Sequence, residues 1–448
     1  TLSKQKVPAF DATDKSVSAA IKAPSKNKVP FTKLLIIGQS RNIDIRKLLE
    51  YETSEVPLSL FQDNGQMRGG KKSMLVPVLE DKYLGGYGIS ENTQAFSGEK
   101  AIVMDGMVMV RILKPSGTFN EFSSMLLDKV IDEATGYSRV DVVFDVYDPQ
   151  SIKSDKRTKR GSQKMRNIRI LNRAMNIPKG WNDFLASINN INELVSFLID
   201  SCRGMVQKIP VGQKFIVSGT DVHHLTEELE GCLSVDHLKS NHDEADTRLL
   251  LHAADILKSV ELAVIRTVDT DVLVLALHHF HDMVESQSTQ DVVMKIGTGN
   301  YRRYIFIGQL YRSMPEGVRV NILSAYAQTG CYSTNALFRI TKTKAVTTLE
   351  REEYHLETLG DPKDPLSKAC KGVQKIYSRT VWRLRRIDRG SIQDICQQGS
   401  KNESALPPSE NAAKYHIQRA AFQTLVWKRA LTAQITEMPS PLEYGWNA

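Results

Sequence analysis

The sequence has few cysteines, and none of them forms a closely spaced pair. The five are scattered and odd in number, at Cys202, Cys232, Cys331, Cys370 and Cys396. A disulfide framework needs paired cysteines and a structural zinc site needs closely spaced ligands, so the pattern argues against both. It is typical of a reducing compartment, and we expect an intracellular protein, nuclear or cytoplasmic.

Long apolar runs are also missing. No stretch approaches the roughly 18 apolar residues of a membrane span, and no signal peptide is recognisable, so we expect no membrane partner. The chain begins at Thr1 and ends abruptly at Ala448, as a fragment of a longer protein would. The sequence contains neither G-x-S-x-G nor H-E-x-x-H, which disfavours two common classes of hydrolase. It does not fix an oligomeric state.

Length and composition allow a large globular core. With 448 residues, of which 41% are hydrophobic, the chain can form one large α/β domain with extensions or two to three domains. The net charge of +8 favours a polyanionic partner such as DNA or RNA, although such an excess can also serve solubility alone.

Local patterns divide the chain into four parts. Residues 1–30 resemble a flexible basic arm, and residues 31–99 an N-terminal α/β extension with a strand at 33–37 and a helix at 72–80. A regular α/β core is predicted at 100–348. Residues 349–448 are predicted to be helical, with a linker at 398–411 and a last helix near 412–432.

Within the extension, Gly65 to Lys72 nearly match the phosphate-binding pattern G-x-x-x-x-G-K-[ST]. The last position is Lys72, which has no hydroxyl to hold Mg²⁺. A plain glycine-rich turn is the favoured interpretation.

Aspartates follow two predicted core strands. A strand at 101–104 ends at Asp105, and another at 139–144 ends at Asp145. Between them, Thr118 with Glu121 three residues later forms a capping-box pattern at the start of a helix. The resulting β-α-β unit places both carboxylates at the carboxyl ends of parallel strands, where ligands bind in open α/β sheets.

Two further carboxylate pairs lie between Asn241 and Phe280. Glu244 and Asp246 fall in the first turn of a predicted helix, where the helix field favours anions, and such residues are also ordinary helix starters. Asp269 and Asp271 follow a strand predicted at 261–267. Clustered carboxylates are oxygen ligands for hard divalent ions, so the pattern predicts a metal site.

A dense basic run follows Asp145. Next to a metal ligand it is well placed to hold phosphates, although a solvated helix face would look the same. Its cations are Lys153, Lys156, Arg157, Lys159, Arg160, Lys164 and Arg166, and the run continues to Arg173. Two zinc sites, one at His278, His279 and His281 and one at Cys232, His237 and His242, lack the usual ligand spacing and are disfavoured.

Together, these elements resemble the flap endonuclease and PIN-like 5′ nuclease superfamily. The resemblance spans about residues 100–340, and five short motifs in the family's order carry it: Val103 to Asp105, Val143 to Asp145, Glu244 to Asp246, Val268 to Asp271, and Gly330 to Tyr332. It implies a PIN-like α/β fold with a mostly parallel central sheet, helices on both faces and a helical C-terminal region.

A closer resemblance covers nearly the whole chain. It is to largely uncharacterised animal proteins with this nuclease-like core, through Pro57 to Phe61, Val142 to Tyr147, Glu244 to Arg248 and Asp269 to Val272. In such relatives the last motif ends in Asp, where this chain has Tyr332. Some continue into a Cys-rich tail that would be missing here.

The resemblance implies a phosphodiesterase that acts on DNA or RNA with one or two Mg²⁺ or Mn²⁺ ions. The implied ligands and catalytic groups are Asp105, Asp145, Glu244, Asp246, Asp269 and Asp271. Tyr332 is the departure, because a neutral phenol is a poor ligand for Mg²⁺. Two hypotheses follow: a metal-dependent nuclease, weakened at this position, and a catalytically inactive nuclease fold that binds nucleic acid or a protein partner.

Overall fold

The structure is a computed structural model of the chain. It describes residues 33, 37–38, 40–41, 51–52, 54–86, 89–90, 98–146, 167–170, 172–225, 235–285, 289–297, 301–351, 356–361, 403–406 and 408–446.

A mixed sheet forms the centre of the described part. Its order is β1 (Ile89–Ser90), β8 (Arg303–Phe306), β7 (Asp291–Ile296), β6 (Leu262–Arg266), β2 (Lys100–Asp105), β3 (Arg139–Val143), β4 (Lys214–Ser218) and β5 (Val222–Leu225). The five strands from β7 to β4 run parallel, whereas β8 and β5 pair antiparallel with the ends of this group. The predicted, mostly parallel central sheet is therefore confirmed.

The register of the central strands aligns their carboxyl ends. Asp105 of β2 lies opposite Val143 of β3, and Met104 lies opposite Arg266 of β6. These strands are almost entirely buried, as expected for parallel strands covered on both faces. The segments that follow β6, β2 and β3 thus start from one edge of the sheet.

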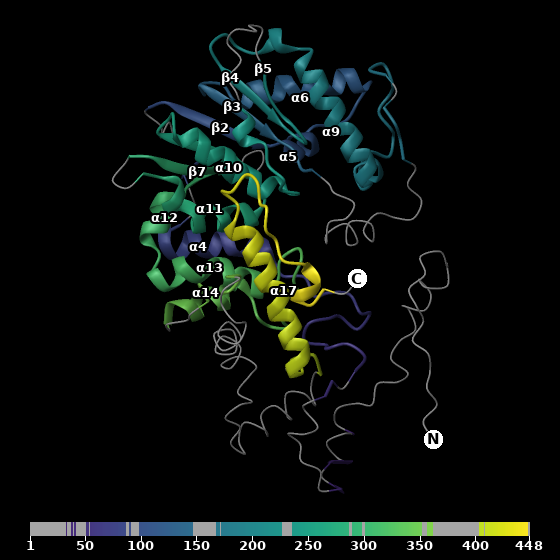
Figure 1. Cartoon of the computed structure of the whole chain (residues 1–448), viewed down its shortest axis with the longest axis vertical. Coiled ribbons are helices and arrows are strands. Elements are labelled where there is room, and N and C mark those ends of the chain that lie inside the picture. The colour runs from purple at the N-terminus through teal and green to yellow at the C-terminus, as the bar shows by residue number, and fades with distance from the viewer. Residues whose placement is uncertain are drawn as a thin grey trace.

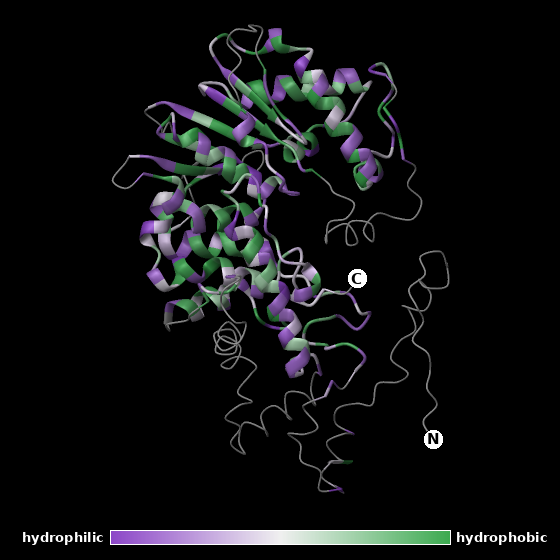
Figure 2. Ribbon diagram, in the orientation of Figure 1, coloured by the Kyte–Doolittle hydropathy of each residue, from purple (hydrophilic) through white to green (hydrophobic). Residues whose placement is uncertain are grey.

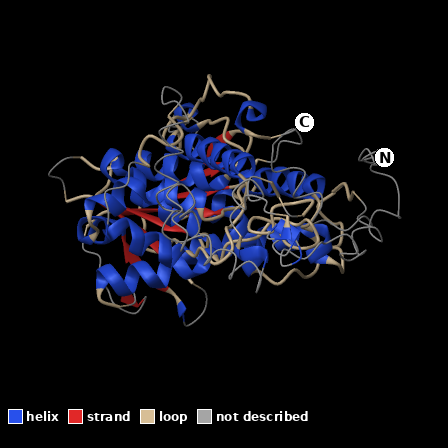
Figure 3. Cartoon of the chain, turned by 90° about the horizontal axis from the view of Figure 1, so that it is seen from below, coloured by secondary structure: helices blue, strands red, loops and turns tan. Residues whose placement is uncertain are grey.

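Helices cover both faces of the sheet (Figures 1 and 3). Ile102 and Met104 of β2 face α5 (Gly106–Ile112), α6 (Phe119–Glu133), the short α8 (Trp181–Phe184) and α9 (Ile188–Arg203). Ala101 and Val103 face the other core, formed with α4 (Leu75–Leu84), α10 (Ala245–Leu257), α11 (Thr270–Met283), α12 (Ile307–Ser313), α13 (Glu316–Gln328), α14 (Lys342–Arg351) and α17 (Glu410–Lys428). In Figure 2 the central strands and these helices carry much of the hydrophobic colour.

Several local signals act as expected. The Thr118 side chain accepts a hydrogen bond from the Glu121 amide, and the Glu121 carboxylate accepts one from the Thr118 amide, so the capping box forms. The helix predicted near 412–432 is α17, and C-terminal helices pack onto the α11 side of the sheet, as Figure 1 shows. None of the described helices is both long and apolar enough to cross a membrane.

Two segments of the extension differ from, or refine, the prediction. Lys33 and Ile37, the two described residues of the strand predicted at 33–37, are helical and contradict that prediction at both ends; a short apolar run does not distinguish a strand from a helix. The glycine-rich segment is a turn, as favoured. The Gln62 amide donates to the Gln66 carbonyl, and Gly65 has a φ of 75°, a conformation that glycine adopts without strain.

Candidate metal centre

Three carboxylates meet at the carboxyl edge of the sheet. One oxygen from each of Asp246, Asp269 and Asp271 lies within 4.8 Å of the others. Within the described ranges, this is the one set of three or more histidine, cysteine or acidic side chains close enough to share a metal ion. The two pairs that the sequence placed in separate motifs therefore contribute to one cluster.

The strand ends fix Asp105 and Asp269 as helix caps. Asp105 ends β2, and its Oδ1 accepts hydrogen bonds of 3.0 Å from the Met107 and Val108 amides at the start of α5. Asp269 follows β6 and caps α11, with Oδ1 2.9 Å from the Asp271 nitrogen. Capping by Asp satisfies amides that the helix leaves unpaired, so these carboxylates are held in fixed directions.

Thr267 connects the two strand ends. Its hydroxyl lies 3.4 Å from Oδ2 of Asp105 and accepts a hydrogen bond of 3.2 Å from the Asp269 amide. Because Thr267 itself is buried, the link joins β2 and β6 inside the protein rather than on its surface.

The other acidic residues gather around the start of α10. Glu244 occupies the N-cap position and Asp246 the first turn, while Oδ1 of Asp145 accepts a 2.7 Å hydrogen bond from the Ala245 amide. Three carboxylates therefore lie where the helix field favours negative charge. The structure thus brings Asp105, Asp145, Glu244, Asp246, Asp269 and Asp271 to one end of the sheet.

The carboxylates of this centre repel one another, and this repulsion adds to burial in raising their pKa values. Burial, followed by the charges of Asp145 and Asp269, raises the pKa of Asp105 to about 7. The pKa of Asp246 is raised well above its ordinary value by burial and by Asp269, Glu244, Asp271 and Asp145. Burial and Asp271 likewise raise the pKa of Asp269. Holding these groups ionised together is unfavourable unless a cation neutralises them.

Two residues that the sequence did not single out for this centre contact Asp271. Nζ of Lys72 lies 2.5 Å from Oδ2, and the Tyr326 hydroxyl donates a 2.5 Å hydrogen bond to Oδ1. Burial lowers the pKa of Lys72, but attraction to Asp271 and Asp269 outweighs it and raises the pKa overall. In the sequence, Lys72 stands out only as a mismatch in a nucleotide-binding pattern, and no local pattern points from Tyr326 to Asp271.

Arg248 of α10 links the chain just after β3 to the end of β4. This buried side chain donates 2.6 Å hydrogen bonds to the Phe144 carbonyl and the Ser218 hydroxyl, and it also donates to the Gly219 carbonyl. Phe144 directly follows β3 and Ser218 ends β4, so Arg248 fixes the chain just before Asp145. Its place in the motif Glu244 to Arg248 has a structural reason.

The other predicted residues lie on the segment after α13, in the core or outside the described ranges. Tyr332 is half-buried on the segment after α13. Lys153, Lys156, Arg157, Lys159, Arg160, Lys164 and Arg166 are not among the described residues, and neither is Cys232. His279 is buried and bonds the Trp427 carbonyl at 2.9 Å, as expected of a core histidine.

The donor chemistry of the cluster fits a hard divalent cation. Three carboxylates within reach of one position supply oxygen ligands, and their raised pKa values reflect a repulsion that a cation relieves. Lys72 already neutralises part of this charge at Asp271.

Comparisons with known proteins give a distant likeness only. No family model matches the sequence, and no curated protein matches it. Two solved structures are similar: the T5 D15 protein co-crystallised with metal ions, with 12% identity and a TM-score of 0.38, and a bacteriophage T5 D15 flap endonuclease variant in a pseudo-enzyme–product complex with DNA and metal ions, with 12% identity and a TM-score of 0.37. Each match covers 75% of this chain and 92% of the other.

Proposed function

We propose that the protein is a divalent-metal-dependent nuclease that hydrolyses phosphodiester bonds in DNA or RNA. The observation that carries the proposal is the convergence of six carboxylates from three adjacent parallel strands and the start of α10, with three of them within 4.8 Å. The net charge of +8 and the basic run at 153–166 support a nucleic-acid partner.

In this proposal Asp246, Asp269 and Asp271 hold one Mg²⁺ or Mn²⁺ ion, and Asp105, Asp145 and Glu244 complete the acidic surroundings or hold a second. Such an ion supplies positive charge to the phosphate and lowers the pKa of bound water. The protein's own groups set the geometry: the caps at Asp105 and Asp269, the Thr267 link and the amide of Ala245 fix the directions of the carboxylates. Hydrolysis adds water to phosphorus and breaks one phosphorus–oxygen bond.

A second candidate is a catalytically inactive nuclease fold that binds nucleic acid or a protein partner. Two observations favour it. Lys72 places an internal cation on Asp271, and Tyr332 stands where the family pattern has an Asp. Both reduce the negative charge available to hold metal ions, which would slow or abolish cleavage.

The experiment compares the native chain with Asp269→Ala and Tyr332→Asp on labelled flap, hairpin and single-stranded substrates, in Mn²⁺ and in Mg²⁺. The nuclease proposal predicts cleavage that needs the metal, is lost in Asp269→Ala and increases in Tyr332→Asp. Asp282→Ala, which removes an exposed acid at the far end of α11, is the matched control and should cut like the native chain.

Metal binding is measured in parallel by titrating Mn²⁺ calorimetrically. Mn²⁺ binding that disappears in Asp269→Ala, without cleavage by the native chain or Tyr332→Asp, selects the inactive candidate. Absence of both Mn²⁺ binding and cleavage rejects the metal centre.

A further inference from the structure

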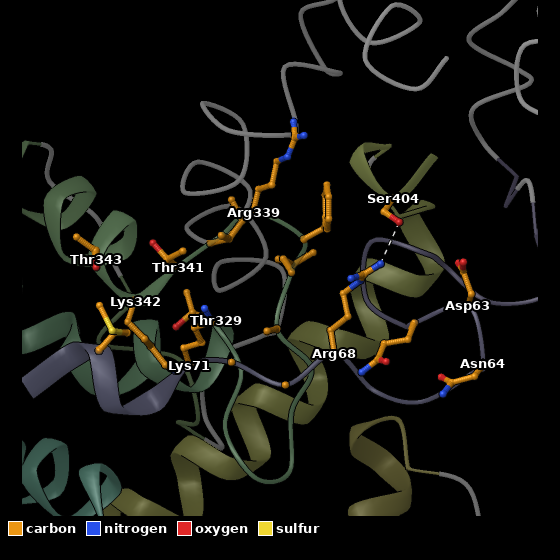
Figure 4. A pocket seen from close by; sticks show the side chains of 18 residues that line it. Asp63, Asn64, Arg68, Lys71, Thr329, Arg339, Thr341, Lys342, Thr343 and Ser404 are labelled. Atoms are coloured by element: carbon orange, nitrogen blue, oxygen red, sulfur yellow. Dashed lines mark hydrogen bonds between the residues drawn. The ribbon is translucent and has the colours of Figure 1, made fainter. Parts of the chain in front are cut away.

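A cavity of about 960 Å³ lies beside the candidate metal centre. Its walls are the turn and the following segment at 62–74 and the segment at 336–343, with Ser404 and Thr329 at their sides (Figure 4). The volume is in the upper range for small-ligand pockets, which is enough for a few nucleotides and too small for a duplex.

The charged side chains that line the cavity are mostly cationic. Arg68, Lys71 and Arg339 contribute positive charge, against the single carboxylate of Asp63, whereas burial lowers the pKa of Lys342 to about 7. Lys342 is committed to the protein, because its ammonium group donates to the Tyr326 and Gly330 carbonyls at 2.6 and 2.7 Å. Lys71 and Arg339 are exposed and border the open space. A concave wall with this charge favours an anionic ligand.

Two of these cations lie close to the ring of Phe338. The guanidinium carbon of Arg68 lies 4.9 Å from the centre of the Phe338 ring, and that of Arg339 lies 5.1 Å from it. Arg68 is held further by the Leu58 carbonyl at 2.8 Å and by the Ser404 hydroxyl at 2.9 Å, the bond drawn in Figure 4. Two guanidinium groups are thus ordered around one ring at the cavity wall, pointing in different directions in Figure 4, and each can meet a phosphate.

The backbone at Arg339 is strained. Its φ is 62°, and it is the one non-glycine residue with positive φ among those that the structure describes. A left-handed conformation is unfavourable for a long side chain, and such strain is concentrated at ligand sites. The strained residue therefore carries a charged side chain at the cavity wall.

One segment joins the cavity to the acidic cluster. Gly69, Gly70 and Lys71 line the cavity, and the next residue, Lys72, forms the ion pair with Asp271. Gly70 packs so closely on the Thr329 and Gly330 carbonyls that an added Cβ would lie 3.0 Å from each oxygen. Lys71 at the cavity wall and Lys72 at the candidate centre are therefore consecutive residues, so the cavity adjoins the centre.

We propose that this cavity binds single-stranded nucleic acid through its phosphates, with Lys71, Arg68 and Arg339 as the phosphate contacts. The inference rests on the proposed function, because it supplies that centre with a positioning site for the strand on one side of the cleaved bond. The contacts are with the backbone, so binding is expected to depend weakly on base sequence.

The test measures binding of a labelled single-stranded oligonucleotide by fluorescence anisotropy over a range of salt concentrations, in EDTA so that nothing is cut. The double variant Lys71→Gln with Arg339→Gly removes two charges; glycine suits the positive φ, so the fold should be kept. Each lost contact lowers the slope of log affinity against log salt by about 0.7, so the slope should fall by about 1.4 and the affinity by about 25-fold at 0.1 M salt.

The matched control is Lys179→Gln with Arg203→Gln, two exposed cations on the α9 side of the sheet, which should leave the slope unchanged. Inorganic phosphate serves as a second probe: loss of phosphate binding in the cavity variant, with unchanged oligonucleotide binding, overturns the proposal. So does an unchanged slope, and so does failure of the native chain to bind the oligonucleotide. If the salt slope falls in the cavity variant while the native chain shows no Mn²⁺-dependent cleavage, the result supports the cavity site and rejects only the nuclease proposal.

Discussion

Nζ of Lys72 lies 2.5 Å from Oδ2 of Asp271, so the acidic cluster contains a cation from the protein itself. Asp271 is almost fully buried and also accepts the Tyr326 hydroxyl, which leaves its two oxygens both engaged. Of the three close carboxylates, Asp246 and Asp269 carry raised pKa values and retain most of the repulsion. A metal ion bound at the proposed centre would compete with Lys72 for Asp271.

Lys72→Met is therefore expected to strengthen metal binding and weaken the metal-free protein. Removing the ammonium group leaves Asp271 without its cationic partner, which should lower the free energy of unfolding in EDTA by about 1–3 kcal/mol. Mn²⁺ should bind at least about tenfold more tightly, because no internal cation has to be displaced. Calorimetric titration with Mn²⁺ and denaturant unfolding with and without Mn²⁺ measure both effects.

Lys82→Met is the control for this substitution. Lys82 forms an ion pair of the same length, 2.5 Å, with Glu350, between α4 and α14 and away from the cluster. It should leave Mn²⁺ affinity unchanged. Weaker Mn²⁺ binding in Lys72→Met would show that the ammonium group assists metal binding instead of competing with it.

Asp246→Asn should make the metal-free protein more stable. Burial and four neighbouring carboxylates disfavour the ionised form of Asp246, and asparagine has nearly the same shape without the charge. We expect a gain of about 0.5–2 kcal/mol in EDTA, as is common when a strained functional group is replaced. The same variant should lose the stabilisation that Mn²⁺ gives the native chain.

The measurement is urea unfolding at pH 7, in EDTA and in excess Mn²⁺. Asp236→Asn, on the 3-10 helix Asp236–Leu238, reports the effect of removing an acid elsewhere. A loss of stability in EDTA would mean that the Asp246 carboxylate is held by favourable contacts and not by a compromise for metal binding.

The strand-end acids were predictable because each depends on a local pattern. A buried apolar run followed by Asp fixes both the strand and the side-chain position, and parallel pairing then brings Asp105, Asp145 and Asp269 to one edge. The capping box of Thr118 and Glu121 was predictable for the same reason, because it spans only four residues.

The partners of Asp271 were not predictable, because their contacts are long-range. Lys72 is 199 residues from Asp271 in sequence and Tyr326 is 55 residues away, and neither position has a local pattern that names its partner. The cavity is equally hidden, since Arg68 and Arg339 meet only through the ring of Phe338. The strand prediction at 33–37 failed at its described residues for a different reason, because a short apolar run is typical of both strands and helices.

Tyr326→Phe tests the hydrogen bond to Asp271. The variant removes one hydroxyl that donates to a buried carboxylate, and hydrogen bonds to charged groups contribute about 1.5–3 kcal/mol to stability. We expect a loss in that range in EDTA, measured by urea unfolding. Tyr311→Phe, a half-buried tyrosine on α12, should change stability by less than about 0.5 kcal/mol. Equal effects of the two substitutions would argue that the Asp271 bond contributes nothing specific.

Asp105→Asn should change how stability depends on pH. The folded pKa of Asp105 is about 7, against an ordinary value of 3.8, so between about pH 4 and 7 the folded chain holds a proton that the unfolded chain has released. Stability from this group is therefore present at low pH and lost as pH rises toward 7, by about 1.4 kcal/mol per pH unit. Asparagine does not titrate, and it keeps the cap on α5.

Other groups titrate in the same pH window, so the measured quantity is the difference in stability between the native chain and Asp105→Asn at each pH. Burial lowers the pKa of His278 to about 3 and that of His416 to about 4, and both make the folded chain more stable as pH rises toward 6.5. These histidines are present in both proteins and cancel when native and Asp105→Asn are compared. In EDTA the variant should therefore gain stability relative to the native chain from about pH 4 to 7 and show no further gain above. A difference that stays flat with pH would mean that Asp105 is ionised throughout, and that a positive charge near it outweighs burial and Asp145.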